Sequence, residues 1–352
     1  MSESESCFYH IPQAGRPVRL PTIPAALSAA NDGGFIWLDF ARSSPERDQM
    51  LKQELTLLVE PFGLHPLAIE DCTDENQIPK IEDFPSNTFV LFNSFRYSEK
   101  ELTIGEVDFF IGRNFLVTVS RGEADGARPF GSIERMLDLD LEEVRPGPAF
   151  LMHVILDRIV DRKFLAIEAL EDELDTAEEK MLANVSEFSP VSLLRLRRDL
   201  LALRKSLFHE REILVKICRK DCPFIGESVI FPYRDIYDHL AKSFELTETF
   251  REIVTSLMEM YLSMINNRMT RFANEMNSTV RRLTFITTIF MPLTLLAGIG
   301  GMSEWTMMTG AANWRIAYPA FIVALVMLGI LSYYFLKWLE ERGRKDDKEI
   351  VG

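Results

Sequence analysis

The stretch Leu283-Thr-Phe-Ile-Thr-Thr-Ile-Phe-Met-Pro-Leu-Thr-Leu-Leu-Ala-Gly-Ile-Gly-Gly-Met302 decides the architecture of this chain. It holds about twenty consecutive residues without an ionisable side chain, which is enough helix to cross a bilayer core of roughly 30 Å at about 1.5 Å per residue. The sequence before it has the charge content of a soluble protein, and only a loop and one more apolar segment follow. The stretch therefore predicts a transmembrane helix over 283–302.

Small and polar residues recur within this helix at intervals of three and four. We call them the stripe: Thr284, Thr287, Met291, Thr294, Gly298 and Gly301. Such spacing is typical of helices that meet around a common axis. The apolar residues beside the stripe can face lipid or a second span; they are Leu283, Ile286, Phe290, Leu293 and Leu296. We interpret the stripe as a pore lining, and the alternative is that its small residues pack transmembrane helices together.

Two further features favour the pore. The same register continues backwards into the soluble part of the chain, where it reaches Asn277 and Val280. Pro292 cannot donate a hydrogen bond to the carbonyl of Thr288, and a freed carbonyl at membrane depth persists only where protein or water satisfies it. Both features are expected of a helix that borders a hydrated path.

A second apolar segment runs over 316–338, and its interfacial anchors are Trp314, Tyr318 and Trp338. Basic residues flank the outer ends of both spans, whereas the loop 303–315 has one Glu and one Arg. The positive-inside rule therefore predicts cytoplasmic termini and an external loop, in a bacterial-type inner membrane. Because one two-span hairpin cannot enclose a hydrated path, the pore requires several copies in a cyclic homo-oligomer.

The soluble part begins with a predicted α/β layer domain. Its first 10–25 residues are expected to be disordered or extended, with no secretory signal. Strands are predicted at 35–39, 88–97, 101–111 and 114–120, with Gly112-Arg113 as the last hairpin turn, and helices at 46–59 and 65–71. Glycine-rich phosphate loops and nucleophile motifs are absent from the sequence, so nothing supports an enzyme. The formal charge of −14 argues against nucleic acid as a partner.

Helical periodicity then continues to the membrane. An acidic helix followed by a basic one predicts an antiparallel pair with facing charges over 148–230. No Gly or Pro occurs from Tyr233 to Met291, so the stalk 231–282 is expected to enter the membrane as one helix, on the order of 90 Å long. The predicted organisation is a cytoplasmic α/β domain (1–147), helical pair (148–230), stalk (231–282), first span (283–302), loop (303–315), second span (316–338) and cytoplasmic tail (339–352).

The four cysteines are Cys7, Cys72, Cys218 and Cys222. With so few of them and no secretory signal, a disulfide framework is not expected. Cys218 and Cys222 lie one helical turn apart and could share a metal ion, but no third ligand is near in sequence. Reduced thiols are therefore predicted.

The chain resembles the CorA-type divalent-cation (magnesium) transporters. The resemblance rests on 233–239 (YRDIYDH), 248–252 (ETFRE), 261–263 (YLS), 288–294 (TIFMPLT) with Ala297-Gly298, 65–71 (HPLAIED) and Pro79-Lys80. It implies an α+β membrane protein with an α/β/α cytoplasmic domain, a stalk helix and two transmembrane helices, assembled as a homopentamer. Its expected partners are the lipid bilayer, divalent cations and further copies of itself.

The resemblance also implies roles for single residues. Pore-facing positions would be Asn277, Val280, Leu283, Thr287, Met291, Thr294 and Gly298. Leu283 and Met291 would form apolar constrictions, and Asn277 and Thr294 would present oxygens to a hydrated ion. Asp71 and Asp235 would be interface carboxylates at which intracellular Mg²⁺ holds the closed state. Mg²⁺ would thus be both the transported and the regulatory ion.

One departure from the family lies at the outer pore mouth. Family members carry Gly-Met-Asn, whereas this chain has Gly301-Met302-Ser303, followed by Glu304 as a possible anionic ring. The stalk between Tyr261 and Leu283 is also about one heptad longer. Zn²⁺, Co²⁺ or Ni²⁺ transport on the same fold is therefore an alternative, and a non-transporting cation sensor is another. An intramembrane enzyme ranks last, because neither apolar interior carries a carboxylate, His, Cys or Lys.

Overall fold

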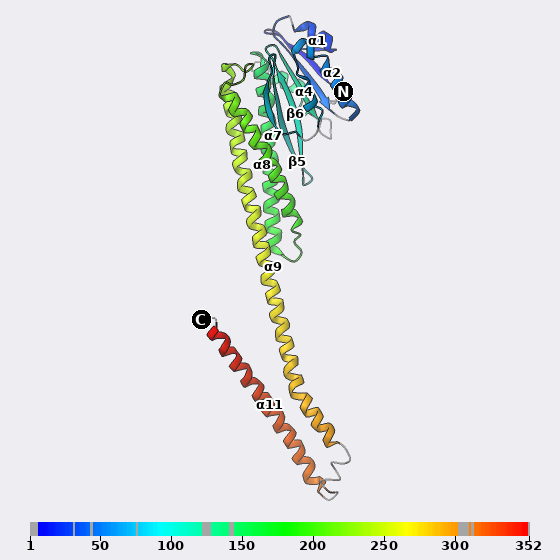
Figure 1. The fold of residues 1–352 in the computed structure, drawn as a ribbon, viewed down its shortest axis with the longest axis vertical. Coiled ribbons are helices and arrows are strands. Elements are labelled where there is room, and N and C mark those ends of the chain that lie inside the picture. Colours follow the sequence, from blue (N-terminus) through cyan, green and yellow to red (C-terminus); the bar gives the residue numbers. More distant parts are fainter. Residues whose placement is uncertain are drawn as a thin grey trace. The chain divides into compact units, whose positions relative to one another are not determined.

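The computed structural model describes residues 6–30, 32–42, 45–74, 77–121, 128–140, 144–301, 310 and 313–350. The chain divides into two compact units, Met1–Leu262 and Ser263–Gly352. In the first unit a sheet is covered by helices on both faces, and the second consists of helical segments (Figure 1). This arrangement confirms the predicted α+β architecture with long helices after it.

A seven-stranded sheet has the order β2-β1-β3-β7-β6-β5-β4. Its strands are β1 (Cys7–Ile11), β2 (Val18–Leu20), β3 (Phe35–Arg42), β4 (Lys80–Asp83), β5 (Thr88–Ser98), β6 (Glu101–Ile111) and β7 (Phe115–Arg121). Among the described strands, only the β3–β7 pairing is parallel. The predicted strands correspond to β3, β5, β6 and β7.

The start of the chain corrects one expectation. Within residues 6–30 the expected disorder is wrong, because β1 pairs with both β2 and β3 and α1 (Ile23–Ala29) follows. Both faces of the sheet are covered here, so Phe8 and Ile11 are buried although they point to opposite sides. β1 is only five residues long, which is too short for its periodicity to predict a strand from the sequence. Its pairing with β3 stabilises it.

One of the two tight turns of the sheet differs in detail from the prediction. The β5–β6 turn places Glu99 and Lys100 at positive φ (51° and 65°), as a two-residue turn of the primed type requires. In the β6–β7 hairpin the Gly112 N–H donates to the Phe115 carbonyl at 3.0 Å. The central residues of that turn are therefore 113–114, one position later than predicted.

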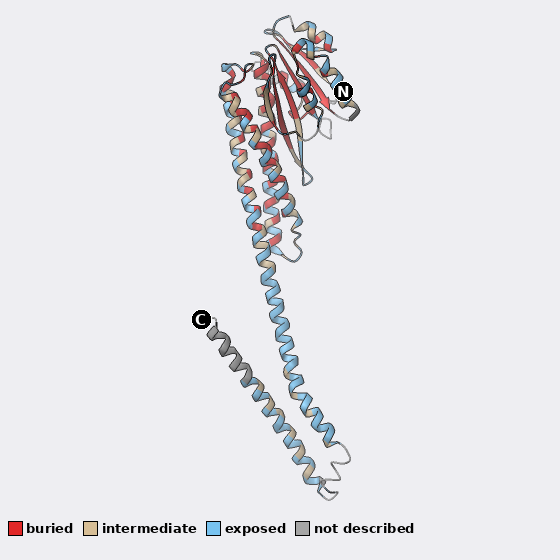
Figure 2. Cartoon of the chain, in the orientation of Figure 1, coloured by how far each residue is buried: buried red, intermediate tan, exposed pale blue. Residues whose placement is uncertain are grey.

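Helices form a layer on each face of the sheet. One face packs against α1, α2 (Pro45–Thr56) and α4 (Pro66–Asp71), with the short α3 (Val59–Phe62) between the last two. The other face packs against α7 (Pro148–Ala183), which follows α5 (Ile133–Leu139). Figure 2 shows buried residues both in the strands of the sheet and along the helices that pack around it. Two separate hydrophobic clusters result, one on each side of the sheet.

The predicted helical pair consists of α7 and α8 (Val191–Cys218). Arg195, near the start of α8, pairs with Glu173, near the end of α7. Further along, Lys163 Nζ lies 2.5 Å from Glu210 Oε1, and both side chains are fully buried. A residue later in α8 thus pairs with a residue earlier in α7, so the two helices are antiparallel. Their charges face each other as predicted.

After the 3-10 turn η1 (Glu227–Val229), helix α9 runs without a break from Ile230 to Gly300 and includes Pro292. Helix α11 covers Trp314–Ile350. These two helices contain the apolar segments that are long enough to cross a membrane. All four cysteines are free, and within the described ranges no group of three metal-ligating side chains occurs around Cys218 and Cys222 or elsewhere.

Candidate pore and regulatory sites

One face of α9 packs against α11 in the second unit. Phe285, Ile289 and Leu293 are less exposed than the residues around them. A Cβ atom at Gly300 would lie 2.5 Å from the ring of Phe321, and one at Gly329 would lie 3.4 Å from Leu293 Cδ1. The two glycines therefore permit the close approach of these helices, and they identify the face of α9 that is occupied within a single chain.

The stripe lies on the other side of α9. At about 100° per residue, its residues centre roughly 170° away from the face that packs against α11. All of the stripe from Thr284 to Gly301 is exposed, and Met291 retains 76% of its accessible surface. Thr294 is nearest to the second span, since it borders an apolar groove with Phe290 and Gly329. Packing against the chain's own second span therefore does not account for the stripe.

The threonine hydroxyls of the stripe are oriented by the helix backbone. Thr284 Oγ1 donates to the Val280 carbonyl at 2.9 Å, Thr287 Oγ1 to the Leu283 carbonyl at 3.0 Å, and Thr294 Oγ1 to the Phe290 carbonyl at 2.8 Å. Each hydroxyl proton is thereby used, and the oxygen lone pairs remain available. Such oxygens accept hydrogen bonds from the water molecules that Mg²⁺ keeps around it.

The outer mouth is described only in part. The Gly301 N–H donates to the Ala297 carbonyl at 3.0 Å and closes the last turn of α9. The predicted mouth residues Met302, Ser303 and Glu304 lie outside the described residues. Their role stays a prediction.

Asp71 ends helix α4 and already has a cationic partner. His65 caps the start of this helix, accepting from Leu67 N at 3.3 Å, and Asp71 Oδ2 lies 2.7 Å from Lys80 Nζ. Lys80 Nζ also lies 3.0 Å from Glu82 Oε1. The Asp71 side chain is 18% exposed, so it is partly accessible at the surface while its Oδ2 atom is held by an ammonium group.

Asp235 lies in the second turn of α9 and is 70% exposed. The ring of His239 is its neighbour, with Nε2 3.7 Å from Asp235 Oδ2. Among the described residues no hydrogen bond or ion pair joins Asp235 to Asp71. Their joint role as metal ligands stays a prediction.

A third carboxylate, Asp157 on α7, interacts with Asp235 and was not among the site residues predicted from the sequence. Burial raises the pKa of Asp157 on α7, and the nearby carboxylate of Asp161 raises it further. His239 lowers that pKa, whereas Asp235 raises it. Asp157 thus shares the electrostatic environment of Asp235. The only sequence signal was the i, i+4 spacing of His153, Asp157 and Asp161 on one helix face.

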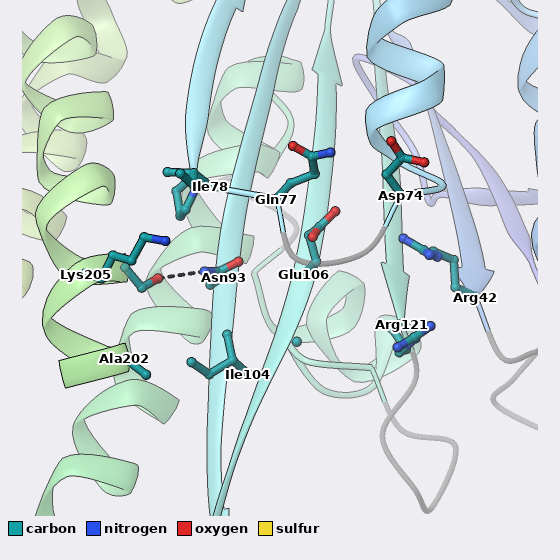
Figure 3. A pocket seen from close by; sticks show the side chains of 13 residues that line it. Arg42, Asp74, Gln77, Ile78, Asn93, Ile104, Glu106, Arg121, Ala202 and Lys205 are labelled. Atoms are coloured by element: carbon teal, nitrogen blue, oxygen red, sulfur yellow. Dashed lines mark hydrogen bonds between the residues drawn. The ribbon is translucent and has the colours of Figure 1, made fainter. Parts of the chain in front are cut away.

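Near α4 the sheet also carries a pocket of about 250 Å³ that the sequence did not predict. Strand pairing sets Asn93 opposite Glu106 and Arg42 opposite Arg121, and β6 and β7 bring the two pairs side by side (Figure 3). Arg42 donates to the carbonyls of Cys72 and Thr73 at 2.6 and 3.2 Å. Arg42 therefore braces the segment that follows Asp71.

Glu106 should make the stability of this domain depend on pH. Burial raises its pKa to about 7, so the folded protein holds a proton that the unfolded chain releases nearer pH 4.5. The resulting stabilisation is present at acid pH and is lost as the pH rises through the folded pKa. We expect Glu106→Gln to raise the free energy of unfolding by about 1–2 kcal/mol at pH 8, allowing for partial exposure, and to change it little at pH 5.

Thermal unfolding of the detergent-solubilised protein between pH 5 and pH 8 measures this effect. Glu101→Gln, at an exposed position of the same strand, is the matched control and should leave the pH profile unchanged. Equal profiles for Glu106→Gln and the parent protein would show that Glu106 does not hold the extra proton.

A family model described as "CorA-like Mg2+ transporter protein" matches residues 32–338, which is most of the chain. The chain belongs to the CorA-like Mg²⁺ transporter family. Members of this family are divalent-cation transporters and not enzymes, which agrees with the absence of catalytic motifs from the sequence. The family membership expected from the resemblance is confirmed.

Relatives of CorA type match over most of their length. The cobalt/magnesium transport protein CorA of Thermotoga maritima is 30% identical over 286 residues, covering 80% of this chain and 78% of that protein. The putative metal ion transporter YfjQ of Bacillus subtilis is 30% identical over 320 residues, covering 90% and 94%. The complete structure of the CorA magnesium transporter from Methanocaldococcus jannaschii has a TM-score of 0.69 at 22% identity, covering 96% of this chain and 98% of that one. The fold is thus that of CorA.

Proposed function

We propose that the chain assembles as a homopentamer and conducts Mg²⁺ into the cytoplasm through a pore lined by α9. The observation that carries this proposal is the position of the stripe, exposed and opposite to the face that packs against α11. A polar stripe exposed to lipid would leave its oxygens without partners, whereas several copies around one axis would hydrate them. Family membership supplies the cation class.

Along this pore, apolar and oxygen-bearing positions alternate. Leu283 and Met291 would narrow it with side chains that exclude water, and Asn277, Thr287 and Thr294 would meet the hydrated ion with neutral oxygens. Val280, Thr284 and Gly298 complete the lining. Because Mg²⁺ sheds its water reluctantly, neutral oxygens outside its hydration shell suit passage better than a tight carboxylate cage.

The proposed topology places both termini in the cytoplasm and the 303–315 loop outside a bacterial-type inner membrane. The support is the distribution of charge: Arg281 and Arg282 precede the first span, and Lys337 begins a basic segment after the second. The exposed apolar residues of α11 would then contact lipid. Uptake would run toward the cytoplasmic domain.

Asp71 and Asp235 are proposed to bind intracellular Mg²⁺ across the interface of adjacent subunits, with Asp157 beside Asp235. When the site is empty, the facing carboxylates would repel each other. When the site is occupied, the bound hard cation would bridge them and hold the ring closed. Loss of the ion would loosen the ring and open the pore. This is negative feedback on uptake.

We expect Asp235→Ala to raise the Mg²⁺ concentration that half-protects the cytoplasmic domain from protease by at least about tenfold, because one carboxylate of each proposed site is lost. Asp235 is largely exposed, so the substitution should leave the thermal midpoint unchanged. Asp238→Ala, at an exposed position of the same helix, is the matched control. Identical digestion of the parent protein with and without Mg²⁺ would remove the regulatory proposal.

Co²⁺ is the second candidate ion, because relatives that match most of the chain are named as cobalt/magnesium transport proteins and Ser303 replaces the amide expected at the mouth. Uptake into liposomes from a panel of Mg²⁺, Co²⁺, Ni²⁺ and Zn²⁺ separates these ions. We expect Mg²⁺ to enter fastest at millimolar concentration. Faster uptake of Co²⁺, Ni²⁺ or Zn²⁺ would identify that ion as the transported one. If no ion were taken up, the protein would be a cation sensor and not a transporter.

A further inference from the structure

Lys80 is shared between two carboxylates at the edge of the sheet. It is the first residue of β4, the terminal strand of the sheet. Its ammonium nitrogen lies 2.7 Å from Asp71 Oδ2 and 3.0 Å from Glu82 Oε1, and 6.0 Å from the centre of the Phe89 ring. Lys80 can therefore leave Asp71 and still keep two of its contacts.

Because Lys80 contacts both Asp71 and Glu82, its ammonium group can compete with a metal ion for Asp71. An ammonium group on a flexible stem is a compact cation that occupies the Asp71 oxygen a metal ion would use. Lys80 and Glu82 are both partly exposed, so transfer of the ammonium group to Glu82 alone buries no charge. A divalent cation at Asp71 would repel Lys80 and favour that transfer.

We propose that Lys80 is a tethered competitor that sets the cation concentration at which Asp71 becomes occupied, and that Glu82 receives it when the cation binds. This inference rests on the proposed role of Asp71 in binding divalent cations. Lys80 is a positioning residue here, since it acts through Asp71 and touches no transported ion. The cytoplasmic set point of the transporter is then adjusted by a residue that is not a ligand.

Two substitutions should shift this set point in opposite directions. Lys80→Met keeps the aliphatic stem and removes the charge, so half-protection against protease should need about three- to fivefold less Mg²⁺. Glu82→Gln removes the receiving carboxylate and leaves Lys80 with Asp71, so half-protection should need about two- to threefold more. Lys80→Arg restores a cation and should stay within about twofold of the parent protein.

The assay uses the full-length protein in detergent, a Mg²⁺ titration and a protease that cuts after aromatic residues, because removal of Lys80 would itself delete a tryptic site. Lys52→Met, on the exposed face of α2, is the matched control and should not move the midpoint. Thermal midpoints of all variants establish that the fold is intact.

The outcomes distinguish the two proposals. A parent protein protected by Mg²⁺, with unchanged midpoints in Lys80→Met and Glu82→Gln, would overturn the competitor alone. A parent protein that Mg²⁺ does not protect would overturn the Asp71 site and the competitor with it. Opposite shifts in the two variants, with Lys80→Arg near the parent, are the expected result.

Discussion

Replacing Met291 with Asp is expected to abolish closure of the pore by intracellular Mg²⁺. Met291 is the large apolar side chain of the stripe and is 76% exposed, and in a ring it would form a constriction that excludes water. Five carboxylates there would hydrate the constriction and attract cations, which removes the barrier to passage. Mg²⁺ uptake into liposomes that contain saturating internal Mg²⁺ should rise by at least about tenfold, the equivalent of about 1.4 kcal/mol of barrier.

Phe290→Leu is the matched control for this experiment. Phe290 is the preceding residue on α9 and borders the groove against α11, so a smaller side chain there should lower thermal stability and leave uptake within about twofold. If Met291→Asp liposomes stay closed under the same conditions, Met291 does not form a gate. If Phe290→Leu has the larger effect on uptake, the wrong face of α9 has been assigned to the pore.

The second large effect is expected in the cytoplasmic domain. Lys163→Met should lower the free energy of unfolding by about 3–5 kcal/mol, because it leaves the Glu210 carboxylate buried without its cation. Lys163 Nζ also lies 4.0 Å from the centre of the Phe92 ring, and Glu210 Oε1 accepts from Asn93 N at 3.0 Å. The pair thus joins α7, α8 and β5 at one point.

Chemical denaturation followed by circular dichroism measures this loss. In the double variant Lys163→Met with Glu210→Gln, most of the stability should return, because the amide oxygen still accepts from Asn93 and no charge is buried. Lys180→Met, on an exposed surface of the same helix, should change stability by less than about 0.5 kcal/mol. An equally small effect of Lys163→Met would mean that the buried pair does not hold the helices to the sheet.

The predictions that succeeded rest on local signals. The length of the uncharged run 283–302 is sufficient to predict a membrane-spanning helix. The β-branched and aromatic content of β5, β6 and β7 predicts these strands. The absence of Gly and Pro from 233–291 likewise anticipated α9 as one helix. Such features are determined by residues that are close together in the sequence, so they can be predicted from the sequence alone.

The features that were missed depend on contacts between distant segments. β1 forms because it pairs with β3, which is far from it in the sequence but not in space. Glu106 and Arg42 come close to each other only through the register of the paired strands. Lys80 reaches Asp71 across a loop, so their pairing was not visible in the spacing. The partnership of Asp71 and Asp235 was expected from the family resemblance and stays a proposal, because it needs a second copy of the chain.

Ion conduction through this protein requires α9 to direct its Thr, Met and Gly edge toward a hydrated axis, and a cryo-electron-microscopy structure of the protein in lipid nanodiscs tests this directly. We predict a fivefold ring in which Thr287, Met291 and Thr294 face the axis and α11 faces lipid. A single chain without symmetric partners, or a ring in which those three side chains point outward to lipid, would contradict ion conduction through this helix.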